Sequence, residues 1–255
     1  MSTPHSSAKP SHYDKEAESY DAFNEKSSAQ INRLIEKILC AHKVKTVLDL
    51  ACGTGSQVFW LAKRGYEVIG VDINTKMLNI ASRKAKQEKM PLKFLKGDMR
   101  TARLGEFDAV ITIFNAIGHL TKRDFERAMR NVHKNLKRGG VYIFDIFNLT
   151  HLLEGNNITK LTIDWQEVVD GAKVREIQYS TISEDGILAS YDTYYEQKGN
   201  PKMSRSSQTL QVYRAEQLAQ MLQRAGFRVL DQCSADGSKF AEKTTERILT
   251  IAEKV

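Results

Sequence analysis

The segment Thr46–Gly55 has the sequence TVLDLACGTG. Its first six residues are mostly apolar, which predicts a short buried strand. Gly53 and Gly55 then allow the backbone to approach a ligand closely. Residues 56–64 predict a helix, and the first N–H groups of a helix have no partner within it. A strand, a glycine turn and a helix in this order predict a βα unit with a ligand-binding turn.

The alternation of strands and helices continues on both sides of this segment. Apolar residues at positions 31, 34, 35, 38 and 39 share one face of a preceding helix. Further strands are predicted at 67–71, 92–96, 109–113, 141–147, 227–232 and 247–252, and further helices at 75–87, 124–136 and 218–225. Strands and helices that alternate at this spacing form a mostly parallel sheet covered on both faces. The sequence therefore predicts an α/β fold with a doubly wound, seven-stranded, Rossmann-like sheet.

The pattern changes between residues 160 and 212, where apolar and polar residues alternate with a period of two. Turn signals at 170–171, 184–186 and 199–201 separate these runs. Such a pattern predicts an antiparallel β meander inserted into the α/β fold. We expect one domain from residues 13–152 and 213–255, and an inserted lid or substrate subdomain from residues 153–212.

The composition is that of an ordinary soluble globular protein. The chain has 255 residues, of which 41% are hydrophobic, enough for one large domain with an insertion. No apolar run approaches the ~20 residues that span a bilayer. The first ten residues are polar and Ser-rich, without the apolar stretch of a secretion signal. We therefore expect residues 1–12 to be a disordered lead-in and the protein to be cytoplasmic.

Cysteine and histidine spacing gives no indication of a metal site. Cys40, Cys52 and Cys233 lie far apart and form no CxxC pair, and the histidines outside the 114–120 segment show no ligand spacing. We expect reduced thiols and no bound metal.

The formal net charge is +7, and much of the excess lies within residues 76–103 and 122–138. A basic surface of this kind could attract nucleic acid or another anionic substrate. The alternative is a solvated surface, since the Lys and Arg residues lie between the apolar positions of the predicted helices.

Residues around the glycine turn favour one class of ligand. A dinucleotide-binding loop has the pattern GxGxxG, whereas Val58 stands in place of the third glycine here. Asp49 lies just before the turn, where a carboxylate would repel a pyrophosphate. The same carboxylate would suit a ligand that carries an ammonium and a sulfonium. This favours S-adenosylmethionine over NAD.

Acidic residues also follow the next two predicted strands. Asp72 ends the second strand, 19 residues beyond Gly53. An acid there can accept hydrogen bonds from both ribose hydroxyls, and Ile73 would lie against the adenine. Asp98 and Met99 follow the third strand, where a carboxylate could accept a hydrogen bond from the adenine amino group.

Together these sites resemble the motifs of the class I S-adenosylmethionine-dependent methyltransferases. The resemblance covers residues 46–147, and residues 247–255 fit the antiparallel last strand of that family. Ala51 departs from the glycine that many members have, and alanine is small enough to replace it. The resemblance implies that the backbone carbonyl of Phe114 binds the cofactor's amino group. It implies a cofactor site that consists of Tyr20, Asp49, Ala51, Gly53, Gly55, Asp72, Ile73, Asp98, Met99 and Phe114.

Residues 114–120 (FNAIGHL) resemble the corresponding segment of small-molecule N-methyltransferases, including enzymes that dimethylate nucleotide-linked amino sugars. They lack the Asn/Asp-Pro-Pro-aromatic motif of nucleic-acid amino methyltransferases. The resemblance implies that residues 13–24 cap the cofactor and that the meander covers the active site. His119 is the candidate catalytic base, because a histidine with a pKa near neutrality can deprotonate an ammonium acceptor. The alternative is a histidine at the start of a helix that only hydrogen-bonds a neighbouring loop.

We therefore expect an enzyme that transfers a methyl group to a nitrogen or an oxygen of a small molecule, since both acceptors need only an aligned lone pair. The alternatives are an RNA or tRNA methyltransferase, suggested by the charge, and a non-catalytic S-adenosylmethionine-binding protein. The expected partner is a small-molecule methyl acceptor, not a nucleic acid or a membrane. The meander could also form a homodimer contact. Its aromatic residues could line the substrate site or hold the strands together: Trp165, Tyr191, Tyr194 and Tyr195.

Overall fold

The computed structural model describes residues 4–14, 17–18, 20–169, 171–197 and 201–255. Its main sheet has seven strands in the order β10-β11-β5-β4-β1-β2-β3. The strands that pair in parallel are β1 (Thr46–Leu50), β2 (Glu67–Asp72), β3 (Lys93–Lys96), β4 (Phe107–Thr112) and β5 (Leu136–Phe147). The antiparallel strands are β10 (Phe227–Ser234) and β11 (Arg247–Lys254). The predicted α/β fold with seven strands is confirmed.

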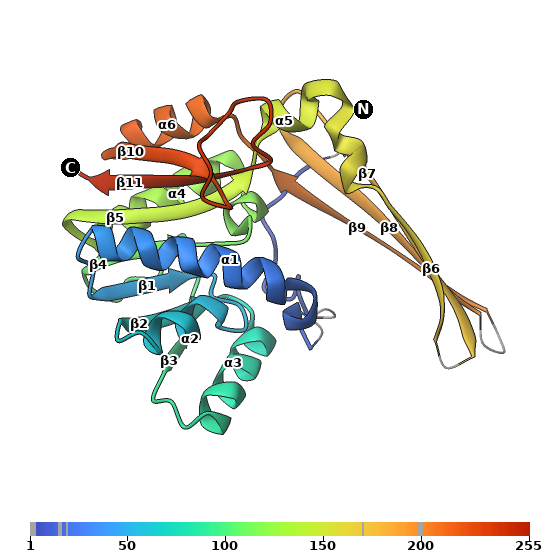
Figure 1. Cartoon of the computed structure of the whole chain (residues 1–255), viewed down its shortest axis with the longest axis horizontal. Coiled ribbons are helices and arrows are strands. Elements are labelled where there is room, and N and C mark those ends of the chain that lie inside the picture. The colour runs from blue at the N-terminus through green and yellow to red at the C-terminus, as the bar shows by residue number, and fades with distance from the viewer. Residues whose placement is uncertain (1–3, 15–16, 19, 170, 198–200) are drawn as a thin grey trace.

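Helices cover both faces of this sheet (Figure 1). The helices α1 (Tyr20–Ala41) and α2 (Ser56–Ala62) pack on the face that includes Val47. The helices α4 (Lys122–Lys134) and α6 (Ala215–Arg224) pack on the opposite face, which includes Leu48. Neighbouring residues of one strand point to opposite faces of the sheet. The apolar run of β1 is therefore buried on both sides, as a central parallel strand requires.

Strand β5 begins five residues earlier than the sequence predicts, at Leu136 rather than 141. Its pairing with β4 passes from Leu136 to Val141, so residues 137–140 form an irregularity in the strand. Gly139 has a φ of 75°, which favours glycine. Gly139 and Gly140 are thus accommodated within the strand as a local irregularity.

The second sheet is the predicted antiparallel meander. It has the order β6-β7-β8-β9 and contains β6 (Ile163–Val169), β7 (Ala172–Ile182), β8 (Ile187–Gln197) and β9 (Lys202–Gln211). The short helices α5 (Leu149–Leu153) and η2 (Glu154–Leu161) lead into it. The sheet forms a long arm that extends away from the main sheet (Figure 1). Leu188 and Val212 anchor the root of this arm in the main hydrophobic core.

The start of the chain differs from the disordered lead-in expected for residues 1–12, of which residues 1–3 lie outside the described residues. Residues 4–14, called the N-terminal strap below, pack against the main domain. The amide of Ala8 donates to the carbonyl of His119 at 2.8 Å. The ring of His5 lies within hydrogen-bond distance of the Thr209 hydroxyl and the Leu120 carbonyl. Sequence periodicity could not show this, because the contacts join residues more than 100 positions apart.

None of the helices in the described part of the chain is long and apolar enough to cross a membrane.

Candidate active site

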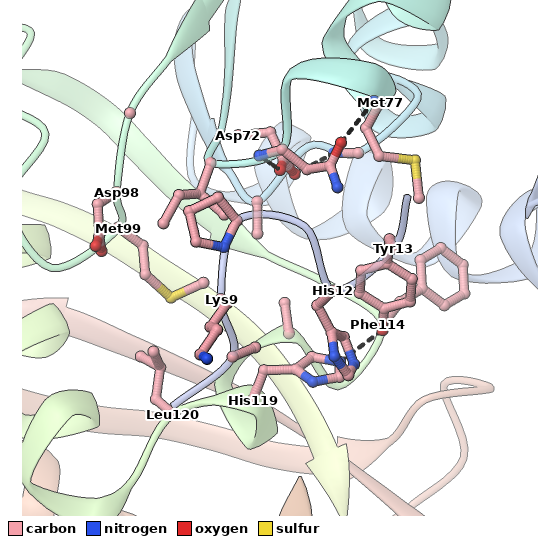
Figure 2. Close-up of a pocket in the computed structure, with 18 of the residues that line it drawn as sticks. Lys9, His12, Tyr13, Asp72, Met77, Asp98, Met99, Phe114, His119 and Leu120 are labelled. Atoms are coloured by element: carbon pink, nitrogen blue, oxygen red, sulfur yellow. Dashed lines mark hydrogen bonds between the residues drawn. The ribbon is translucent and has the colours of Figure 1, made fainter. Parts of the chain in front are cut away.

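A pocket lies where the carboxyl ends of β1, β2, β3 and β4 meet, the place where α/β sheets bind ligands. The N-terminal strap closes its other side, and Figure 2 shows Lys9, His12 and Tyr13 facing Phe114 and His119. The predicted site residues that line the pocket are Tyr20, Ala51, Gly53, Asp72, Ile73, Asp98, Met99, Phe114 and His119. Nine of the eleven predicted residues, drawn from distant parts of the sequence, therefore share one cavity.

The two others lie behind the wall of this pocket. Gly55 has a φ of 90°, and a Cβ atom there would lie 3.0 Å from the Phe94 ring, so its role is local packing. Asp49 is almost fully buried, and its Oδ2 has no hydrogen-bond partner among the described residues. Burial raises the pKa of the Asp49 carboxyl, and the nearby charge of Asp72 raises it further. A buried acceptor without a partner calls for an explanation, and a cationic ligand group above the glycine turn would supply one.

Asp72 joins the glycine turn to the start of α3 (Thr75–Gln87). Its Oδ2 accepts from the Gly53 amide at 2.8 Å, and its Oδ1 accepts from the Asn74 amide at 2.7 Å. Burial raises the pKa of this carboxyl, while the two amides act to lower it. Each carboxylate oxygen has two lone pairs, so Asp72 retains acceptor capacity towards the pocket. It can therefore hold the turn and accept from ribose hydroxyls at once.

Ala51 adopts a left-handed conformation, with a φ of 68°. This conformation is unfavourable for a residue with a Cβ atom, so the backbone at this position favours glycine although the chain has alanine. The Ala51 amide donates to the Val71 carbonyl at 2.7 Å, which holds the turn against the end of β2.

Asp98 lines the pocket beyond β3, but its carboxylate is already engaged. Arg100 donates to both Asp98 oxygens, and its other terminal nitrogen donates to Asp124 at 2.6 Å. Although burial acts to raise it, these hydrogen bonds and the Arg100 charge hold the pKa of Asp98 below its usual value. Ser7 of the strap also donates to Asp124, at 2.6 Å. Sequence reasoning missed Arg100 and Asp124, which connect the predicted adenine end of the pocket to the strap.

His119 lies at the end of η1 (Ala116–His119), and its Nε2 is 2.6 Å from the Tyr13 hydroxyl. The rings of His12 and Tyr13 pack edge-on against it. Its Nδ1 is buried and has no hydrogen-bond partner among the described residues. Burial, assisted by His12 and His5, lowers the pKa of His119 to about 3. The near-neutral pKa expected from the sequence therefore does not hold in this closed arrangement, and His119 is a neutral imidazole at physiological pH.

Tyr20, at the start of α1, contributes a phenol to the pocket. Burial and the charge of Asp72 raise its pKa to about 12, so the phenol stays protonated. It can act as a hydrogen-bond donor towards a ligand.

The meander does not contribute to this pocket in the described structure. The only pocket residues outside the main domain core belong to the N-terminal strap, and none of the described residues of β6–β9 lines the cavity. Trp165, Tyr191 and Tyr194 are exposed instead. The strap is therefore the segment that encloses the site, and the bond between His5 and Thr209 connects it to β9.

Comparison with known proteins supports this assignment. Residues 47–140 match the family model described as a methyltransferase domain. The glycine/sarcosine N-methyltransferase of Parasynechococcus marenigrum is 35% identical over 128 residues, which is 49% of this chain and 45% of that protein. The demethylmenaquinone methyltransferase of Thermus thermophilus is 38% identical over 100 residues, or 38% and 44% of the two chains. Each match spans less than half of the relative's length.

Among solved structures, an amino pentose methyltransferase from Micromonospora echinaspora, with S-adenosylmethionine bound, covers 90% of this chain. The match covers 92% of that protein, with a TM-score of 0.71 and 20% identity. The comparisons confirm the predicted resemblance to class I S-adenosylmethionine-dependent methyltransferases. They support S-adenosylmethionine as the cofactor of the domain.

Proposed function

We propose that this chain transfers the methyl group of S-adenosylmethionine to a nitrogen of a small molecule. The main observation behind the proposal is that Asp72 and His119 line the same cavity. A carboxylate suited to ribose hydroxyls and a buried neutral imidazole therefore face one ligand space. The similarity to a glycine/sarcosine N-methyltransferase and to an amino pentose methyltransferase also favours a nitrogen acceptor.

The residues of the pocket fit the cofactor. Asp72 offers acceptors for ribose hydroxyls, and the Gly53 turn leaves open space beside its backbone. The unpartnered Asp49 oxygen belongs to the strand that leads into this turn and suits an ammonium group. Ile73 and Met99 line the pocket and would contact the adenine. When bound, S-adenosylmethionine supplies a methyl group on a sulfonium, which an aligned lone pair displaces in line.

The acceptor end of the pocket favours an uncharged amine. Burial disfavours the charged form of any basic group, and His119 already shows the effect because its pKa is lowered to about 3. An amine that binds beside His119 is desolvated in the same way, so its pKa falls and its lone pair becomes free. In this scheme the Tyr13 hydroxyl accepts from Nε2, and the unpartnered Nδ1 of His119 accepts a hydrogen bond from the uncharged amine and so orients its lone pair.

A small acceptor is favoured over RNA because the strap encloses the pocket. Ala8, Lys9, Pro10, His12 and Tyr13 all line it, so a nucleotide within a polymer would have to displace the strap. An oxygen acceptor is the second candidate, since a hydroxyl group beside His119 could donate its hydrogen bond to the same Nδ1 lone pair.

Two measurements test the proposal. Isothermal titration with S-adenosylmethionine and S-adenosylhomocysteine, with NAD as the control, should show binding of the first two only. Methyl transfer from labelled cofactor should then be assayed on glycine, sarcosine, amino sugars, phenols and bulk tRNA. Label on an amine, lost in Asp72→Ala, supports the proposal. Label on tRNA alone contradicts the proposal. The absence of any binding signal for S-adenosylmethionine and S-adenosylhomocysteine also contradicts it.

A further inference from the structure

The turn that follows β4 contains two successive non-glycine residues in the left-handed conformation. Phe114 has a φ of 64° and Asn115 a φ of 57°. Such values are uncommon for residues with a side chain and need support from the surroundings. Phe114 lines the pocket, so the unusual backbone belongs to the wall of the proposed active site.

A buried carboxylate supports this turn. Asp145 of β5 is fully buried, and its Oδ1 accepts from the Phe114 amide at 2.6 Å. Its Oδ2 accepts from the Asn115 amide at 3.3 Å. Successive amides in a turn can converge on one anion, and here the anion is a side chain of the neighbouring strand.

A cation from a third part of the chain accompanies the carboxylate. Arg247, the first residue of β11, donates from Nε to Asp145 Oδ2 at 3.0 Å, and a terminal nitrogen of Arg247 also donates to it. The antiparallel pairing places Arg247 opposite Phe147 of β5. The Arg247 guanidinium also lies 5.5 Å from the centre of the Phe114 ring. A buried carboxylate requires such a partner. Arg247 therefore stabilises the turn in two ways, through the Asp145 carboxylate and through the Phe114 ring.

We propose that Asp145 and Arg247 are positioning residues that hold the 114–115 turn in the conformation that cofactor binding requires. Neither residue lines the pocket; both act through the backbone of Phe114. This inference rests on the proposed function for its ligand. The dependence of the turn conformation on Asp145 does not require a ligand and can be tested without one.

Asp145→Asn is the decisive variant. An amide has the shape of a carboxylate, but its NH2 group is a donor and would face the Phe114 amide, the Asn115 amide or Arg247. The matched control is Asp108→Asn. Asp108 likewise accepts from two amides, those of Lys45 and Thr46, and pairs with Lys137, but its partners have ordinary φ values.

Both variants should lose thermal stability, and only Asp145→Asn should lose ligand affinity. We expect its Kd for S-adenosylhomocysteine to rise by about tenfold or more, the size typical of a lost charge-assisted hydrogen bond. For Asp108→Asn we expect a Kd within about twofold of the parent. If Asp145→Asn does not fold, Arg247→Lys replaces it, because lysine keeps the charge but loses the two-nitrogen contact.

Crystal structures of the parent and the variant provide the second readout. The φ values of Phe114 and Asn115 should be positive in the parent and should leave the left-handed region in Asp145→Asn. An unchanged turn, or unchanged affinity in a variant that folds, overturns the inference. If the parent itself binds no S-adenosylhomocysteine, the proposed function fails, and the torsion angles alone decide whether Asp145 holds the turn.

Discussion

The hydroxyl oxygen of Tyr13 lies 2.6 Å from Nε2 of His119, which joins the N-terminal strap to the segment after β4. The two residues are 106 positions apart in the sequence. Because both line the same pocket, the strap supplies a direct contact to the imidazole at the proposed acceptor end.

Tyr13→Phe should lower kcat and leave cofactor affinity nearly unchanged. The substitution removes the hydroxyl beside Nε2 and leaves this buried nitrogen without that partner, at a cost of about 1–3 kcal/mol. We expect a fall of about tenfold or more in kcat, measured with saturating cofactor and the best acceptor of the panel. His119→Ala should produce a loss at least as large. Full activity in both variants would remove this pair from the mechanism.

The stability of the protein should fall below pH 6.5 because His119 is buried in its neutral form. Its pKa is lowered from 6.5 to about 3 in the folded state, so the unfolded chain binds the proton first as the pH falls. The contribution of His119 to the free energy of unfolding is fully present above pH 6.5 and is smaller by about 2 kcal/mol at pH 5. Urea unfolding at pH 7.5 and pH 5 measures the loss.

His119→Gln is the control for this pH dependence, since glutamine does not titrate and can still reach the Tyr13 hydroxyl. The difference in unfolding free energy between pH 7.5 and pH 5 should be about 2 kcal/mol smaller in this variant. Equal pH dependence in the two proteins would show that His119 titrates normally in the folded state.

Asp72→Ala should abolish cofactor binding and also destabilise the fold. The substitution removes the acceptor for the Gly53 and Asn74 amides, and each unpaired buried amide costs about 1–3 kcal/mol. Calorimetry and thermal melting measure the two effects. Asp164→Ala on the exposed arm removes an ion pair with Arg175 and should change neither. Parent-like affinity in Asp72→Ala would mean that the ribose site is wrongly assigned.

Ser7→Ala should loosen the N-terminal strap without unfolding the main domain. The Ser7 hydroxyl donates to Asp124 at 2.6 Å and accepts from the Thr121 amide at 3.1 Å. Loss of these two bonds, about 1 kcal/mol each, should speed hydrogen exchange of residues 4–14 by about thirtyfold. Ser183→Ala is the control, because Ser183 accepts from an amide in a turn of the arm. Equal exchange of the strap in parent and Ser7→Ala would contradict this anchoring role.

Local sequence patterns, together with the family resemblance, indicated the main elements and nine of the residues that line the pocket. Periodicity and turn residues indicated the seven strands, the order of helices and the antiparallel arm. Gly53 and Asp72 could be assigned to the pocket because each follows a predicted strand, and parallel strands bring such ends to one edge of the sheet. Phe114 was assigned through the resemblance to the methyltransferase family. These features depend on residues that are close along the chain.

Only the tertiary structure decided the partners of these residues. The contacts Tyr13–His119, Arg100–Asp124 and Asp145–Arg247 join segments 24 to 106 positions apart, so they depend on strand order and on how the strap packs. The low pKa of His119 likewise follows from burial beneath the strap, and desolvation is a property of the folded surroundings rather than of the residue. The physical reason is general: sequence periodicity shows which face a side chain occupies, whereas hydrogen bonds and burial require the position of every neighbouring segment.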